Sequence, residues 1–142
     1  MSELIILRGL PASGKSTWAR VHQLEAPGAL IVNRDALRRM LHGDRPHSHA
    51  DEAVTRLVRD AIISVALREG RSVISDDTNL TPKHVADLTT LARCYGATVR
   101  IVALDTPLDV CIRRDAARAT PLGEAAIRAL AERARKAVGE AL

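Results

Sequence analysis

Aromatic side chains are almost absent from this sequence. Its 142 residues include one tryptophan, one tyrosine and no phenylalanine. Proteins that hold single-stranded nucleic acid by stacking its bases need several aromatic rings on one surface. The composition therefore argues against a base-stacking platform. A nucleic acid partner would be held mainly through its phosphates, with little readout of base sequence.

Cysteines and long apolar runs are also scarce. Cys94 and Cys111 are too few for a disulfide framework, so we expect free thiols that are buried or unreactive, as in the reducing cytoplasm. The apolar run after Glu3 is only four residues long, so we expect no signal peptide. No stretch approaches the roughly 20 apolar residues of a membrane span. These features together predict a cytoplasmic protein without a membrane segment.

Arginine, in contrast, is abundant. Apolar residues make up 46% of the chain, which is enough for a core, and the length predicts one domain over residues 1–142. The chain carries 21 Lys and Arg against 17 Asp and Glu, and 18 of the 21 are arginine. Arginine is the better planar, bidentate ligand for phosphate. Codon bias in an alanine-rich chain is an equally simple explanation of this excess.

Short apolar runs alternate with segments of helical periodicity along the chain. We expect strands at residues 3–8, 29–33, 72–75 and 98–104. Helices are expected at residues 15–25, after Asp35, across 54–65, from Pro82, from Pro107 and across 127–138. Thr81-Pro82 and Thr106-Pro107 each resemble an N-cap followed by proline at the first helical position. The alternation predicts an α/β fold in which a parallel sheet of about four strands has helices on both faces.

The segment "GLPASGKSTW" at residues 9–18 follows the first predicted strand and opens the first predicted helix. It matches G-x-x-x-x-G-K-[ST], the phosphate-binding loop of nucleotide-binding proteins, in the context that this motif requires. The residues expected to hold the nucleotide are Gly9, Ala12, Ser13, Gly14, Lys15, Ser16 and Thr17. Lysine reaches the β- and γ-phosphates, and the serine hydroxyl binds Mg²⁺. We therefore expect ATP, or another nucleoside triphosphate, together with Mg²⁺.

Polar residues follow the other predicted strands, where ligands bind in parallel sheets. After the second strand, Asp35 could cap a helix, or it could accept the proton of an attacking hydroxyl, with Arg38 one turn further along on the same face. After the third strand, Asp76 and Asp77 compete for the role of the acid that holds Mg²⁺ directly or through water. A solvated acidic loop is the alternative interpretation of this pair.

The last basic cluster is "CIRRDAARATP" at residues 111–121. Arg114 and Arg118 lie four residues apart near the end of a predicted helix and would share one face. Arginines on a lid above the phosphates could offset the charge that develops on a transferred phosphoryl group. A solvated basic face is the alternative.

Taken together, "GLPASGKSTWAR", "NRDALR", "SDDTNLTP" and "RDAAR" resemble the 5′-kinase module of the phage-type polynucleotide kinase–phosphatases, in the same order and over nearly the whole chain. The resemblance implies a P-loop kinase fold with a small arginine-bearing lid. Lys15 and Ser16 would serve the phosphates and Mg²⁺. Asp35 would be the general base and Arg38 would bind an acceptor phosphate. Asp77 matches the acid of D-T-N-L, and Arg118 matches the lid arginine that contacts the nucleotide, with Arg114 as its companion.

The chain departs from this family in four places. Ala12 stands where the family more often has glycine, and "SDDTNL" contains an extra acid, so the choice between Asp76 and Asp77 stays open. The segment after Arg118 is short, and no D-x-D-x-T phosphatase motif occurs. The resemblance thus implies a 5′-kinase without the 3′-phosphatase activity of the two-domain enzymes.

The function expected from these features is transfer of the γ-phosphate of ATP, or another nucleoside triphosphate, to the 5′-hydroxyl end of RNA or DNA. One alternative is a kinase for another hydroxyl, on a small metabolite, a sugar nucleotide or an aminoacyl-tRNA; N-R-D-x-x-R favours the polynucleotide acceptor. A second alternative is a nucleotide-dependent binding module with slow hydrolysis, which would not need Asp35 as a base. The choices between RNA and DNA, between ATP and GTP, and between monomer and oligomer stay open.

Overall fold

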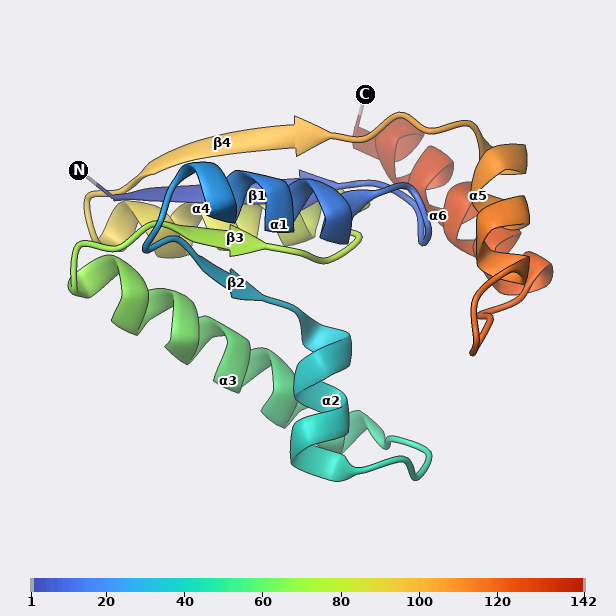
Figure 1. Ribbon diagram of the computed structural model, residues 1–142, viewed down its shortest axis with the longest axis horizontal. Coiled ribbons are helices and arrows are strands. Elements are labelled where there is room, and N and C mark those ends of the chain that lie inside the picture. Colours follow the sequence, from blue (N-terminus) through green and yellow to red (C-terminus); the bar gives the residue numbers. More distant parts are fainter. Residues whose placement is uncertain (1, 142) are drawn as a thin grey trace.

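The computed structural model describes residues 2–141 and contains one four-stranded sheet. The strands are β1 (Glu3–Arg8), β2 (Leu30–Val32), β3 (Val73–Ser75) and β4 (Thr98–Ala103). They lie in the order β2-β3-β1-β4, and every neighbouring pair is parallel (Figure 1). Parallel neighbours need crossover connections, and here helices make each of them.

The central strand β1 is buried on both faces. Leu4 and Ile6 point to one face, and Ile5 and Leu7 point to the other, because successive side chains of a strand alternate. None of the four is exposed to solvent. An uninterrupted apolar run is what a strand covered on both faces requires, so this run predicted β1 correctly.

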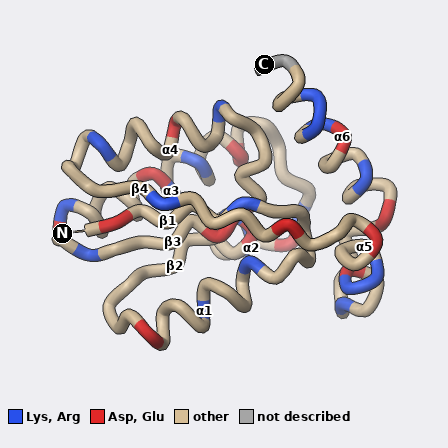
Figure 2. Tube along the Cα trace, turned by 90° about the horizontal axis from the view of Figure 1, so that it is seen from above, with Lys and Arg blue, Asp and Glu red and all other residues tan. Residues whose placement is uncertain are grey.

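Helices cover both faces of the sheet, as expected. They are α1 (Lys15–Glu25), α3 (His49–Arg68) and α4 (Pro82–Cys94). Trp18 and Ala19 of α1 pack against Ile5 and Leu7, whereas Ile63 of α3 and residues of α4 pack on the opposite face. Figure 2 shows α1 on one side of the sheet and α4 on the other. The α/β prediction is confirmed.

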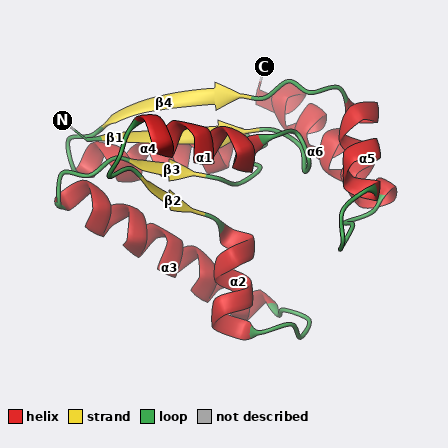
Figure 3. Ribbon diagram, viewed as in Figure 1, coloured by secondary structure: helices red, strands yellow, loops and turns green. Residues whose placement is uncertain are grey.

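Three further helices gather beyond the carboxyl ends of the strands. They are α2 (Arg34–His42), α5 (Leu108–Ala116) and α6 (Glu124–Ala141). Helix α2 packs against α3, and α6 packs against both α5 and α4. Figure 3 shows α2 and the α5–α6 pair at the same end of the sheet, where the loops after β1, β2 and β3 also lie. This end therefore collects the polar residues that follow the strands.

At the helix starts, the structure excludes one alternative interpretation and corrects one expectation. Asn33, and not Asp35, caps α2, because the Asn33 side chain accepts a hydrogen bond from the Ala36 backbone N–H. The Thr106 hydroxyl does not cap α5; it donates to the Ser13 backbone carbonyl at 2.8 Å, and α5 begins later, at Leu108. Thr106 thus ties the segment after β4 to the phosphate loop, a long-range contact that no local pattern reveals.

Cys111 is buried, Cys94 is exposed, and both are free thiols. Among residues 2–141, no helix combines the length and the apolar character that crossing a membrane requires.

Candidate functional site

The phosphate loop between β1 and α1 has a backbone that only small residues allow. A Cβ atom on Gly9 would lie 2.6 Å from the Ser13 hydroxyl and 3.0 Å from the Leu104 carbonyl oxygen. Gly14 has a φ of +104° and Ala12 a φ of +63°, both in the left-handed region. That conformation is cheap for glycine and costly for alanine, which explains why glycine is frequent at the position of Ala12 in the family that the sequence resembles.

Lys15 lies buried inside this loop. Its ammonium donates to the backbone carbonyls of Gly9 at 3.0 Å and Leu10 at 2.7 Å. Burial lowers the pKa of Lys15, and the nearby Asp76 carboxylate partly opposes that shift. A desolvated ammonium surrounded by curled backbone is well suited to phosphate oxygens.

Ser16 and Asp76 form the pair that could hold a divalent cation. The Ser16 hydroxyl donates to Asp76 Oδ2 at 2.8 Å, while Asp76 Oδ1 is buried and has no hydrogen-bond partner. A hydroxyl beside an unpartnered carboxylate oxygen fits Mg²⁺, which takes one or two protein oxygens together with phosphates and water. Within residues 2–141 no group of three His, Cys, Asp or Glu side chains could hold a metal ion.

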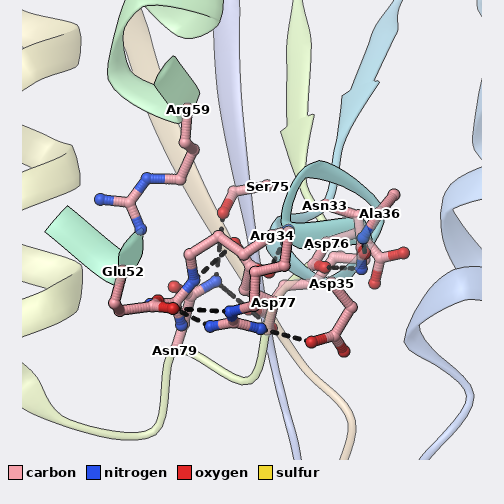
Figure 4. Close-up of polar contacts among 12 residues, drawn as sticks. Asn33, Arg34, Asp35, Ala36, Glu52, Arg59, Ser75, Asp76, Asp77 and Asn79 are labelled. Atoms are coloured by element: carbon pink, nitrogen blue, oxygen red, sulfur yellow. Dashed lines mark hydrogen bonds and ion pairs between the residues drawn. The ribbon is translucent and has the colours of Figure 1, made fainter. Parts of the chain in front are cut away.

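Asp77 faces away from that pair and toward α2. It accepts a hydrogen bond from the Arg34 backbone N–H at 2.9 Å, and its other oxygen lies 3.4 Å from Arg34 Nε (Figure 4). Burial raises the pKa of Asp77, although the positive charge of Arg34 partly opposes the shift. The two adjacent acids are thus separated: Asp76 lies at the phosphate loop, and Asp77 anchors the start of α2.

Two asparagines support these loops. The Asn33 amide donates to the Asp76 backbone carbonyl at 2.6 Å while its oxygen caps α2. Asn79 is fully buried, and its amide donates to the Leu7 carbonyl at 2.8 Å. Asn33 belongs to the N-R-D motif and Asn79 to the D-T-N motif. The motifs could therefore have pointed to these two residues, whereas a search for acids and bases alone passed over them.

Asp35 and Arg38 lie together on one face of α2, as their spacing predicted. The Asp35 side chain is 76% exposed and forms an ion pair with Arg38 Nη1. Sequence reasoning missed the second partner of Arg38. Glu52, on α3, accepts from Arg38 Nε and from Nη2, each at 2.7 Å.

The contact between Glu52 and Arg38 is bidentate and largely buried, with side-chain exposures of 26% and 24%. Hydrogen bonding to Glu52 raises the pKa of Arg38, and the same bond lowers the pKa of Glu52. A guanidinium has five N–H donors, so three contacts leave two donors for a ligand. Glu52 therefore fixes the orientation of a cation that still has binding capacity.

Arg118, which the sequence predicted to be a lid arginine, lies beside a buried acid, Asp115. Arg118 lies two residues beyond the end of α5, and so does not continue the helical face of Arg114. Asp115 accepts hydrogen bonds from the Leu122 and Gly123 backbone N–H groups at 3.0 and 2.9 Å, and Arg118 Nη1 lies 3.4 Å away. The two backbone bonds lower the pKa of Asp115. Asp115 thus closes the short segment that carries Arg118.

Three adjoining cavities share these residues. We call them the donor cavity (about 510 Å³), the inner cavity (about 350 Å³) and the outer cavity (about 660 Å³). Lys15 and Ser16 line the donor and inner cavities, Asp35 and Arg38 line the inner and outer cavities, and Arg118 lines all three. Further residues of the donor cavity are Ala12, Gly14, Thr17, Arg20 and Arg114.

The inner cavity therefore joins the two groups of residues that the sequence predicted separately. Asp76 and Asp77 line it as well, next to Asn33 and Arg34. A phosphate donor at the loop and an acceptor at α2 would meet there, with Arg118 beside both.

Comparison with known proteins supports this description. An AAA domain family matches residues 4–137. Mouse 2′,3′-cyclic-nucleotide 3′-phosphodiesterase is 37% identical over 102 residues, which are 70% of this chain and 23% of the mouse protein.

Solved structures show the same fold. A chain of the Pnkp1/Rnl/Hen1 RNA repair complex is 27% identical, with a TM-score of 0.85 over 98% of this chain and 46% of that one. The Mycobacterium tuberculosis APS kinase CysC, in complex with AMPPNP and APS, is 27% identical, with a TM-score of 0.63 over 80% of this chain and 68% of that one.

This chain thus spans less than half of the repair-complex chain and about a quarter of the mouse protein. The family match nevertheless covers most of the chain, and the phosphate loop, the parallel sheet and two arginines beside the loop, Arg114 and Arg118, are all present. The chain belongs to this AAA domain family and has the fold of a P-loop kinase.

Proposed function

We propose that residues 1–142 act as a single kinase domain that transfers the γ-phosphoryl group of ATP, or another nucleoside triphosphate, to the 5′-hydroxyl of RNA or DNA. The observation that carries the proposal is the inner cavity, which Asp35 and Arg38 of α2 line together with Lys15 and Ser16 of the phosphate loop. A binding module with slow hydrolysis would not need an exposed carboxylate and an oriented arginine opposite the phosphate loop.

In this reaction the acceptor oxygen forms a bond to the γ-phosphorus while the bond from that phosphorus to the β,γ-bridging oxygen breaks. Asp35 accepts the proton of the hydroxyl, and the products are a 5′-phosphate and the nucleoside diphosphate. Lys15 and Arg118 offset charge on the transferred group. Mg²⁺, held by Ser16 and Asp76, would neutralise charge on the β- and γ-phosphate oxygens.

Arg38 suggests the class of acceptor. Its two remaining donors, held in place by Glu52, suit the oxygens of a phosphate. In a polynucleotide that phosphate is the 3′-phosphate of the nucleotide that carries the reacting 5′-hydroxyl. The similarity to a chain of an RNA repair complex supports this acceptor, whereas the similarity to an APS kinase supports only the transfer chemistry.

The test is incubation with γ-labelled ATP, Mg²⁺ and a 5′-hydroxyl oligonucleotide, with free nucleosides, sugars and adenosine 5′-phosphosulfate as competing acceptors. We expect label at the 5′ end of the oligonucleotide. A nucleoside 3′-monophosphate should exceed the bare nucleoside in kcat/KM by about 10- to 100-fold, the value of one charge-assisted contact.

The Arg38→Ala variant should remove most of that preference while leaving the KM for ATP within a few-fold. Equal rates for the nucleoside and its 3′-monophosphate in the wild type would contradict the polynucleotide assignment. Labelling of a competitor in place of the oligonucleotide would identify a different kinase.

A further inference from the structure

The outer cavity extends beyond the reacting groups. It continues from the inner cavity past Asp35 and Arg38, and its remaining wall includes Arg39, His47, Arg118 and Thr120. At about 660 Å³ it is larger than the inner cavity, and its volume lies within the range of cavities that hold small ligands. A mononucleotide acceptor bound at Arg38 would leave this space unused.

Arg39 is the cation of α2 that has no assigned partner. Arg34 pairs with Asp77 and Glu52, and Arg38 pairs with Asp35 and Glu52. Arg39, in contrast, forms no ion pair and no side-chain hydrogen bond within residues 2–141, and it is exposed.

The position of Arg39 follows from the helix. It stands four residues after Asp35, on the same face and about 6 Å further from the start of α2 at a rise of 1.5 Å per residue. The phosphate loop adjoins the start of α2 through the inner cavity. A nucleic acid strand whose 5′ end lies at Asp35 would therefore reach Arg38 first. It would then reach the outer cavity and Arg39.

We infer that the outer cavity is a subsite for the second phosphate of a polynucleotide acceptor and that Arg39 is its principal ligand. The inference rests on the proposed function and extends it from a single nucleotide to the strand. No aromatic residue except the His47 imidazole lines the cavity, so the subsite recognises phosphate and not base identity. Asp44 also lines it and limits its affinity for an anion.

Two acceptors isolate this phosphate. A dinucleoside monophosphate, NpN, carries one phosphate, for Arg38. The same dinucleotide with a 3′-terminal phosphate, NpNp, carries a second one and no additional base. The ratio of their kcat/KM values, measured within each variant, cancels any general loss of activity.

For the wild type at low salt we expect NpNp to exceed NpN by about twofold to fivefold, the range for an exposed charge pair. The log–log dependence of kcat/KM on salt should be steeper for NpNp by about 0.7, the value for one phosphate of a single strand. Arg39→Ala should bring the ratio to one and the two salt slopes together. Asp44→Asn should increase the ratio. The control is Arg68→Ala, at an exposed site at the C-terminal end of α3. This variant should keep both the wild-type rates and the wild-type ratio.

A wild-type ratio of one, or a ratio in Arg39→Ala equal to that of the wild type, would overturn the subsite while leaving the kinase assignment intact. Failure to phosphorylate NpN at all would instead overturn the proposed function, and the subsite with it. The melting temperature of Arg39→Ala should match that of the wild type, since Arg39 has no partner to lose.

Discussion

Replacing Glu52 with glutamine should reduce activity through Arg38, although Glu52 need not touch either substrate. The carboxylate accepts from Arg38 Nε and Nη2 at 2.7 Å each, and both side chains are about three-quarters buried. Glutamine keeps the shape but retains one acceptor oxygen and turns an N–H₂ group toward the guanidinium. At least one charge-assisted hydrogen bond is lost, and Arg38 is no longer held in one orientation.

The magnitude is set by the contact between Arg38 and the acceptor phosphate, which a misoriented guanidinium no longer makes. A hydrogen bond to a charged group contributes about 1.5–3 kcal/mol, which corresponds to about 10- to 100-fold in kcat/KM. The decrease should appear with a nucleoside 3′-monophosphate, whose phosphate Arg38 would bind, and should be less than about threefold with the bare nucleoside. The KM for ATP should be unchanged. Glu52→Asp, which keeps the charge on a shorter chain, should lie between glutamine and the wild type.

The assay is steady-state transfer from labelled ATP to both acceptors, with melting temperature measured in parallel. Glu69→Gln is the matched control, because Glu69 forms an exposed ion pair with Arg68 at the far end of α3. An equal loss with both acceptors would show that Glu52 supports the fold in general. Unchanged kinetics with the 3′-monophosphate would show that Arg38 does not depend on Glu52, and either result would refute the reasoning.

The other predictions concern single residues. Lys15→Ala should abolish transfer while the protein stays folded, because this ammonium serves the donor phosphates; a folded variant with most of its activity would contradict that role. Asp35→Asn should slow turnover by about 10²–10⁴ and leave ATP binding, measured by calorimetry, within a few-fold; near-normal turnover would exclude Asp35 as the base. Arg118→Lys should stay at least about tenfold slower than the wild type despite its charge, because an ammonium does not reproduce the planar fork; a wild-type rate would refute the lid assignment. Asp115→Asn should lower the melting temperature at pH 7, with a difference that shrinks as the pH falls below about 4. Folding lowers the pKa of this carboxylate, so its stabilisation is complete above the unfolded pKa and is lost as the pH falls from there through the folded pKa. A pH-independent difference would argue against the bonds from Leu122 and Gly123.

The sequence was sufficient where the physics is local. The phosphate loop is a short-range pattern, since Gly9, Gly14, Lys15 and Ser16 lie within eight residues and each has a steric or electrostatic reason to be there. The alternation of apolar runs and helical periodicity likewise predicted the four strands and the parallel sheet to within a residue or two at most boundaries. The spacing of Asp35 and Arg38 placed them on one face of a helix, as the structure has them.

Tertiary structure decided the side-chain contacts between segments that are distant in the chain. The sequence did not separate the roles of Asp76 and Asp77, because neighbouring residues have the same local signal; only the fold brings Ser16 to the first and Arg34 to the second. Glu52 belongs to no recognisable motif. It lies 14 residues after Arg38 in the chain and becomes its partner only because α2 and α3 pack together.

Capping shows the same division. Thr81-Pro82 and Thr106-Pro107 look alike in sequence, yet Thr81 accepts a bond from the His84 backbone N–H whereas the Thr106 hydroxyl is taken by the Ser13 carbonyl. Local sequence determined the elements and the nucleotide-binding motif, since turns, caps and periodicity depend on neighbours a few residues away. The pairing of charges and the line of cavities from the phosphate loop to Arg39 depend on how α2, α3 and the helices after β4 meet the phosphate loop at one end of the sheet, and only the packed fold sets that arrangement.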